Sequence, residues 1–168
     1  MRKTTGVLLA LCALAAAAVR ADDPEPPDDV KAELKKLQGT WTVTKIRDGT
    51  RETKPLTGLT FTFDGDKLLT TQIGLTKRKT KDKYDLKESF KVKIDAKKKP
   101  HTIDLVPDGK GIGMVGIYKI EKGELYIARG LPGPGKAAKA PERPKDFEGE
   151  GVLVYVMTRQ KDKEKPEE

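Results

Sequence analysis

Few residues in this chain could perform nucleophilic or acid–base chemistry. His101 is the single histidine and Ser89 the only serine, so a Ser-His-acid triad would have to use both. Cys12 is the only cysteine, so three or four His and Cys ligands for a zinc ion cannot be assembled. His101 follows three lysines and a proline, a setting typical of a solvated side chain. The sequence predicts no catalytic residue, no metal site and no cofactor.

Carboxylates are abundant, but the sequence fixes no distance between any two of them. Asp104 alternates with Ile103 and Leu105 and should face away from the core, although an acid facing a ligand inside a barrel stays an alternative. A carboxylate pair for glycoside hydrolysis could come from several others. These are Asp64, Asp66, Glu88 and Glu148.

The segment 111–116, GIGMVG, matches the G-x-G-x-x-G pattern of dinucleotide-binding folds. That pattern binds pyrophosphate only when it follows a strand and begins a helix, whose amides hold the phosphates. Here it follows the turn PDGK and enters the strand GIYKI. We expect glycines that let a curled strand bend or bulge, and no phosphate site.

Two basic runs, 76–83 and 97–99, could attract polyanions. Neither contains an aromatic residue on which a base could stack, so we predict no nucleic-acid binding. Lysines at hairpin tips discourage edge-to-edge strand pairing, which is the simpler role. Anionic glycans or lipid headgroups at a cell envelope stay possible partners by electrostatics alone.

The N-terminus has the features of a signal peptide over residues 1–21. Arg2 and Lys3 precede an apolar run over 7–19, and small residues lead to a cleavage site after Ala21. That run is shorter than the roughly 20 residues of a membrane-spanning helix, so we expect an exported protein, periplasmic or extracellular, without a transmembrane segment. Leu11 precedes Cys12, and the apolar run continues beyond it, which disfavours a lipoprotein.

Cleavage removes three cations and no acid, which lowers the formal net charge from +8 to +5, and it removes the only cysteine. The domain must therefore be stable without disulfides. Residues 22–28 are acidic and proline-rich, and 161–168 are densely charged; both read as disordered. The interval 29–160 has the length of one domain.

The periodicity of apolar residues predicts the elements of that domain. Val30, Leu34 and Leu37 recur at helical spacing behind Asp28 or Asp29 as a cap. From residue 40 onward the period is two, with turn signals such as Asp-Gly at 64–65 and Glu-Lys-Gly at 121–123. Eight or nine short strands favour an antiparallel barrel or sandwich. The expected strands are TWTVTKI, GLTFTF, DKLLTTQ, ESFKVKI, HTIDLV, IGMVGIYKI, ELYIAR and GVLVYVMTR.

The alternation also predicts which side chains point inward. The expected inward set is Trp41, Val43, Leu59, Phe61, Phe63, Phe90, Val92, Ile94, Ile103, Leu105, Leu125, Ile127, Leu153, Tyr155 and Met157. The Gly- and Pro-rich connection over 130–144 is long, so it is either a tolerated surface insertion or a flap beside one end of a barrel.

A short helix followed by Gly39, one spacer and Trp41 resembles the entry of the lipocalin-like barrels. In that group the tryptophan closes one end and an arginine of the last strand lies across it, and Arg159 ends the last expected strand. The resemblance implies an all-β fold: one antiparallel lipocalin-like β-barrel of about eight strands with a short N-terminal helix. The alternative is a core tryptophan and a solvated arginine.

Five blocks in order resemble a family of small exported lipocalin-like domains of unknown function, expanded in planctomycetes. They are LQGTWTVTKIRDG, KKKPHTIDL, GIYKIEKGELYIA, ERPKDF and VLVYVMTRQ. The resemblance implies a fold and an exported setting but no activity. Members often carry a cysteine where this chain has Ala128, so a role that depends on that thiol is absent.

Two functions follow from this barrel. The first is an exported, non-enzymatic module that binds a small apolar or amphipathic molecule inside the barrel. The second is a filled barrel that serves as a structural or interaction domain of the cell envelope and contacts anionic partners through its basic loops. For the first function, the side chains expected to line the cavity are Phe61, Phe63, Phe90, Tyr155 and Met157.

Overall fold

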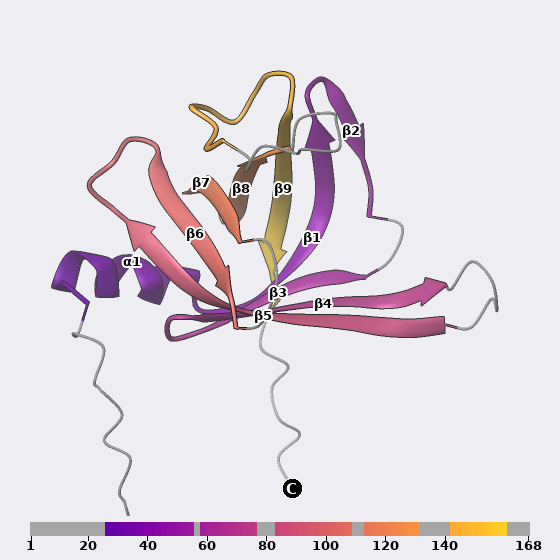
Figure 1. Ribbon diagram of the computed structural model, residues 1–168, viewed down its shortest axis with the longest axis horizontal. Helices are drawn as coiled ribbons and strands as arrows, with labels where there is room; N and C mark the ends of the chain where they lie inside the picture. The colour runs from indigo at the N-terminus through magenta and orange to yellow at the C-terminus, as the bar shows by residue number, and fades with distance from the viewer. Residues whose placement is uncertain (1–25, 56–57, 77–82, 109–112, 132–141, 161–168) are drawn as a thin grey trace, which may run out of the picture.

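A computed structural model describes residues 26–55, 58–76, 83–108, 113–131 and 142–160. Within them the chain forms one helix and nine strands (Figure 1). The helix is α1 (Asp28–Leu37). The strands are β1 (Gly39–Asp48), β2 (Arg51–Thr53), β3 (Leu59–Asp64), β4 (Lys67–Thr76), β5 (Lys83–Asp95), β6 (His101–Pro107), β7 (Met114–Glu121), β8 (Glu124–Gly130) and β9 (Val152–Arg159).

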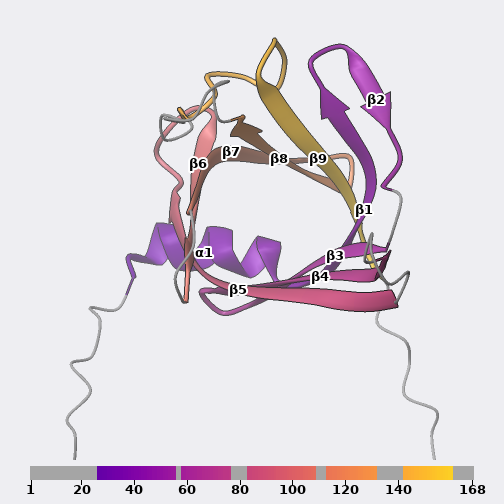
Figure 2. The ribbon, with the colours of Figure 1, turned by 45° about the vertical axis from the view of Figure 1, so that its right-hand side comes forward.

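The strands form a closed antiparallel barrel. Neighbours in sequence pair in the order β3-β4-β5-β6-β7-β8-β9, and β1 pairs with both β3 and β9, which closes a ring of eight strands (Figure 2). The ninth strand, β2, pairs with β1 over Ile46–Asp48, beyond the part of β1 that pairs with β3. The predicted all-β barrel of about eight strands with a short N-terminal helix is confirmed.

The helix α1 packs with its apolar side against the barrel. Leu34 and Leu37 are buried in the same core as the inward-facing strand residues. Pro27 occupies the N-cap position and no side chain caps the helix, so the predicted cap at Asp28 or Asp29 is wrong. Both carboxylates lie within the first turn, where they interact favourably with the positive end of the helix dipole.

The barrel interior is filled by apolar side chains. Every member of the predicted inward set except Leu153 belongs to this core, either buried or packed against it. The buried members are Leu34, Leu37, Trp41, Val43, Phe61, Phe63, Leu68, Val92, Ile103, Leu105, Tyr118, Leu125, Ile127 and Met157. Alternation of apolar and polar residues therefore identified the inner wall.

A second, smaller apolar cluster lies on the outside of β7, β8 and β9. Ile117, Ala128, Val154 and Val156 are buried there, and Phe147 packs against them. Phe147 belongs to the irregular segment 142–150 before β9. Segment 142–150 thus covers part of an outer face that the alternation of residues assigns to solvent.

The structure differs from the sequence-based expectation in the length of one hairpin and in the presence of one additional strand. The β4–β5 hairpin is longer than predicted, because β5 begins at Lys83 and β4 extends to Thr76, and it projects beyond the neighbouring strands (Figure 1). The strand β2 was not predicted, since Arg51–Thr53 is exposed and has no apolar residue. The predictions for residues 1–21, for most of 22–28 and of the basic run 76–83, for 161–168, and for the flap around 132–141 fall outside the described residues.

Candidate functional site

The end of the barrel beside α1, here called the closed end, is held together by Trp41 and Arg159. The Arg159 guanidinium lies over the Trp41 ring, 4.6 Å from the ring centroid, as the resemblance implied. Arg159 Nη2 also donates to the Lys36 carbonyl oxygen at 2.5 Å, and Trp41 Nε1 donates to the Leu37 carbonyl oxygen at 2.7 Å. The first and last barrel strands therefore both bind the last turn of the helix.

Gln38 and Gly39 form the junction between the helix and β1. The Gln38 side chain donates to the Gly65 carbonyl oxygen at 3.0 Å and accepts from the Gly65 amide at 2.8 Å, which ties the helix to the β3–β4 turn. Gly39 has φ +96°, a backbone conformation that favours glycine. Its missing side chain leaves space beside the Arg159 guanidinium. The Gly-x-Trp pattern thus reflects a sharp turn beneath an arginine.

The opposite end of the barrel, here called the far end, exposes part of its inner wall. Five apolar side chains that pack against the core are only partly buried there: Ile46, Leu59, Phe90, Met114 and Tyr155. We call these five the apolar rim. Leu59 and Met114 begin β3 and β7 at this end, and Ile46 pairs with Tyr155. Phe90 lies within β5 and pairs with Pro107, the last residue of β6. Val30 and Ile94 are also partly buried beside the helix, so the far end holds five of the seven partly buried apolar side chains of the core.

The five predicted cavity residues divide between these two regions. Phe61, Phe63 and Met157 are 5, 2 and 0% exposed and belong to the packed core. Phe90 and Tyr155 belong to the apolar rim, and the Tyr155 ring lies 5.5 Å from that of Phe61. Direct contact of any of the five with a ligand stays a prediction.

The β4–β5 hairpin extends the inner wall beyond the rim. Tyr84 and Leu86 alternate with the inward-facing Phe90 along β5, and each is 41% exposed. Leu86 lies opposite Gln72, and Tyr84 lies opposite Leu75. A ligand at the far end would find a further apolar surface along this hairpin.

Arg129 lies on the inner wall at the far end, and the sequence reasoning missed it. It alternates on β8 with Leu125 and Ile127, which are fully buried in the core, while Ala128 belongs to the outer cluster. It stands opposite Gly116 on β7 and Leu153 on β9. The same alternation that identified the inward leucine and isoleucine could have identified this cation.

The two candidates for a catalytic triad are not brought together. The Ser89 carbonyl oxygen accepts from the Asp108 amide, so Ser89 lies beside the far end of β6, whereas His101 begins that strand. At about 3.3 Å per residue the two are some 20 Å apart. Ser89 is also exposed on the outer face, since it alternates with the inward-facing Phe90.

His101 is partly buried at the closed end, in contrast to the solvated side chain expected from the sequence. Its ring lies 5.5 Å from that of Tyr118, and its Nδ1 atom is buried without a hydrogen-bond partner. The Tyr118 hydroxyl donates to the Glu33 carboxylate at 3.4 Å. Burial, reinforced by the negative charge of Glu33, raises the pKa of Tyr118 well above its usual range.

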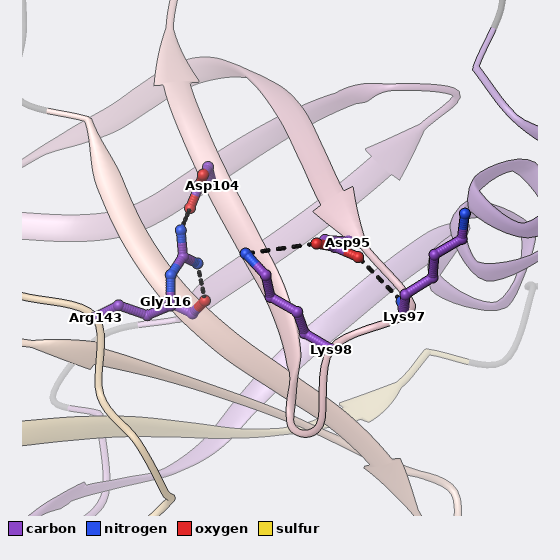
Figure 3. Close-up of polar contacts among 6 residues, drawn as sticks. All are labelled: Asp95, Lys97, Lys98, Asp104, Gly116 and Arg143. Atoms are coloured by element: carbon purple, nitrogen blue, oxygen red, sulfur yellow. Dashed lines mark hydrogen bonds and ion pairs between the residues drawn. The ribbon is translucent and has the colours of Figure 1, made fainter.

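Asp104 faces outward and is held by an arginine (Figure 3). Arg143 Nη2 donates to the Asp104 carboxylate at 2.7 Å, and Arg143 Nη1 donates to the Gly116 carbonyl oxygen at 2.5 Å. This clamp fixes the segment 142–150 against β6 and β7. Asp104 is therefore part of a structural contact on the outside of the barrel.

The structure describes residues 113–116 of the G-x-G-x-x-G motif, and these do not begin a helix. Gly116 lies within β7 and is buried, and a Cβ atom at this position would meet the Ala128 carbonyl oxygen at 2.5 Å. The close approach of the β7 and β8 backbones thus requires glycine here. Met114 to Gly116 of the motif therefore belong to the barrel wall, as predicted for the strand that it enters.

Within the described residues, no group of three or more His, Cys, Asp or Glu side chains could hold a metal ion. The described part of the chain also contains no helix with the length and apolar character needed to cross a bilayer. Comparisons with protein-family models, with curated proteins and with solved structures found no match to this chain.

Proposed function

We propose that this chain is an exported, non-enzymatic domain of the lipocalin-like family that it resembles, and that the far end of its barrel binds a small apolar or amphipathic molecule. The basic start, apolar run and small residues of 1–21 support export. The mass of the protein purified from its own host tests this part, because cleavage after Ala21 leaves a chain that begins at Asp22.

The observation that carries the binding proposal is the uneven burial of the inner wall. Five of the seven apolar side chains that are only partly buried against the core form the apolar rim, whereas the other two, Val30 and Ile94, lie beside α1. Each square ångström of apolar surface that a ligand covers contributes about 25 cal/mol to binding. A small apolar molecule against the rim therefore gains free energy without disturbing the packed half of the barrel.

The neutral dye N-phenyl-1-naphthylamine tests this proposal, because its fluorescence rises in an apolar environment. Met114 belongs to the rim, so we expect Met114→Glu to abolish the fluorescence increase that the wild-type protein gives. Val106 is an exposed apolar residue on the outer face of β6, and Val106→Glu is the matched control, which should bind like the wild type. The emission of Trp41 reports whether each variant is folded.

Two results would contradict the binding proposal. One is a folded wild-type protein that gives no fluorescence increase with this dye at any accessible concentration. The other is equal binding by the Met114→Glu variant, which would place the dye away from the rim.

The outer face of β5 favours a second function, contact with an anionic polymer of the cell envelope. Lys87, Lys91 and Lys93 alternate along this face, and Lys67 on β4 stands directly opposite Lys91. Lys91 also pairs with Asp66 at 4.0 Å, and the exposed cations beside this pair would attract a polyanion. Retention on a heparin column that falls after Lys67→Gln and Lys93→Gln would support this function, and unchanged retention would contradict it.

A further inference from the structure

We propose that the molecule bound at the far end carries one negative charge, and that Arg129 binds this headgroup. The inference rests on the proposed binding function and specifies its ligand class: a small monoanionic amphiphile, with its apolar part against the rim. It is distinct from the polyanion contact, which involves the outer wall.

The position of Arg129 is fixed by the register of β8. Its neighbours at two-residue spacing, Leu125 and Ile127, are fully buried inside the barrel. Arg129 is the next inward position toward the far end, and it is itself only partly exposed. The residue directly opposite Arg129 on the neighbouring strand β7 is Gly116, which has no side chain that could cover the guanidinium.

Arg129 differs from the other partly buried or stacked arginines because it has no partner in the described residues. Arg143 pairs with a carboxylate, Arg159 stacks on an indole, and Arg47 lies 5.9 Å from the Tyr126 ring centroid. Arg129 makes no ion pair, side-chain hydrogen bond or ring contact within the part of the chain that the structure describes. A partly desolvated guanidinium without a partner favours an incoming anion.

Two carboxylates at the far end bear on this inference. Asp48 on β1 and Arg129 on β8 both lie opposite Leu153 of β9, one on each side of it. Glu88 lies on β5, across the barrel from β8. Both side chains are exposed, and neither pairs with Arg129. Asp48 should weaken the binding of an anion by repulsion. Neutralising Asp48 should therefore raise the affinity for the anion, whereas neutralising Arg129 should lower it.

The rim places the apolar part of the ligand opposite this charge. Leu59 and Phe90 stand on β3 and β5, across the ring of strands from β8. The exposed Leu86 continues that wall along the hairpin. A molecule with its headgroup at Arg129 and its chain against β3–β5 would contact both features at once.

Competition between the neutral dye and two ligands of equal chain length tests the inference. Decanoate carries a negative charge on its headgroup, and 1-decanol is neutral. Displacement of the dye gives the affinity for each, and the ratio of the two affinities measures how much the charge contributes to binding. We expect the wild type to bind decanoate about tenfold more tightly than decanol, the size of effect given by a charge-assisted hydrogen bond. Arg129→Gln should remove this preference and leave the affinity for decanol unchanged.

Two further variants serve as controls. Lys35→Gln makes the same charge change on α1, at the closed end, and should keep the preference for decanoate. Asp48→Asn should increase the preference severalfold, which tests the headgroup position even if Arg129→Gln does not fold.

The outcomes separate the two proposals. If the dye binds but the wild type does not prefer decanoate, or if Arg129→Gln keeps the preference, the assignment of Arg129 is overturned while the binding site stands. If the dye does not bind the folded wild type, the proposed function fails, and this inference fails with it.

Discussion

Removing the arginine that covers Trp41 should destabilise the protein measurably. Arg159→Ala deletes a guanidinium 4.6 Å from the indole centroid and its hydrogen bond to the Lys36 carbonyl oxygen. An exposed cation–π contact contributes about 0.5–1 kcal/mol, and a hydrogen bond from a charged donor about 1.5 kcal/mol or more when well shielded. Because Arg159 is exposed, we expect the free energy of unfolding to fall by about 1–2 kcal/mol.

Urea unfolding followed by tryptophan emission measures this change, since Trp41 is the only tryptophan. Trp41 is 2% exposed, and loss of its cover should also shift its native emission to longer wavelength. Arg51→Ala removes an exposed arginine from β2 and is the matched control. An unchanged unfolding midpoint together with an unchanged emission maximum for Arg159→Ala would refute the closing role of this arginine.

Three further predictions concern the wall and the clamp. Gly116→Ala should lower the free energy of unfolding by about 1–3 kcal/mol in urea titrations, because its Cβ would collide with the Ala128 carbonyl oxygen; wild-type stability would disprove this. A double-mutant cycle of Arg143→Ala and Asp104→Ala should give a coupling of about 0.5–1 kcal/mol, and additivity would contradict the clamp. The raised pKa of Tyr118 means that stability present below pH 10 is lost as the pH rises beyond it, since only the unfolded state ionises there. Tyr118→Phe should therefore make stability less dependent on pH between 9 and 11, and an unchanged alkaline slope would count against this.

The sequence predicted the barrel because its inner wall follows a strict alternation. Phe61 and Phe63 on β3, and Leu125 and Ile127 on β8, illustrate strands whose inner positions are apolar. Turn residues with positive φ, such as Gly65, then fixed where the hairpins reverse. These are local signals, and a single sequence carries them in full.

Features that depend on distant contacts could not be predicted in the same way. Val154 and Val156 occupy outward positions on β9, where they are buried in a cluster against which Phe147 of segment 142–150 packs. The strand β2 has no apolar residue, so its pairing with β1 leaves no periodic signal. The burial of His101 depends on Tyr118, which lies on the next strand.

The candidate site was predicted less well than the fold. Phe90 and Tyr155 lie at the far end, but Phe61, Phe63 and Met157 lie deeper in the packed core. Alternation assigns a side chain to the inner face, yet it does not say how far along the barrel the packing remains tight. That depth depends on the stagger of all eight strands and on the position of the helix.

Both ends of the described chain leave the barrel on the same side. The helix begins at Asp28 next to the β5–β6 turn, where Lys97 pairs with Asp29, and the Gln160 amide donates to the Thr40 carbonyl oxygen at the start of β1. Any anchor, linker or fusion partner attached before the helix or after β9 would therefore emerge beside α1. Tethering through either terminus would orient Arg129 and the apolar rim away from the point of attachment, toward the surrounding medium.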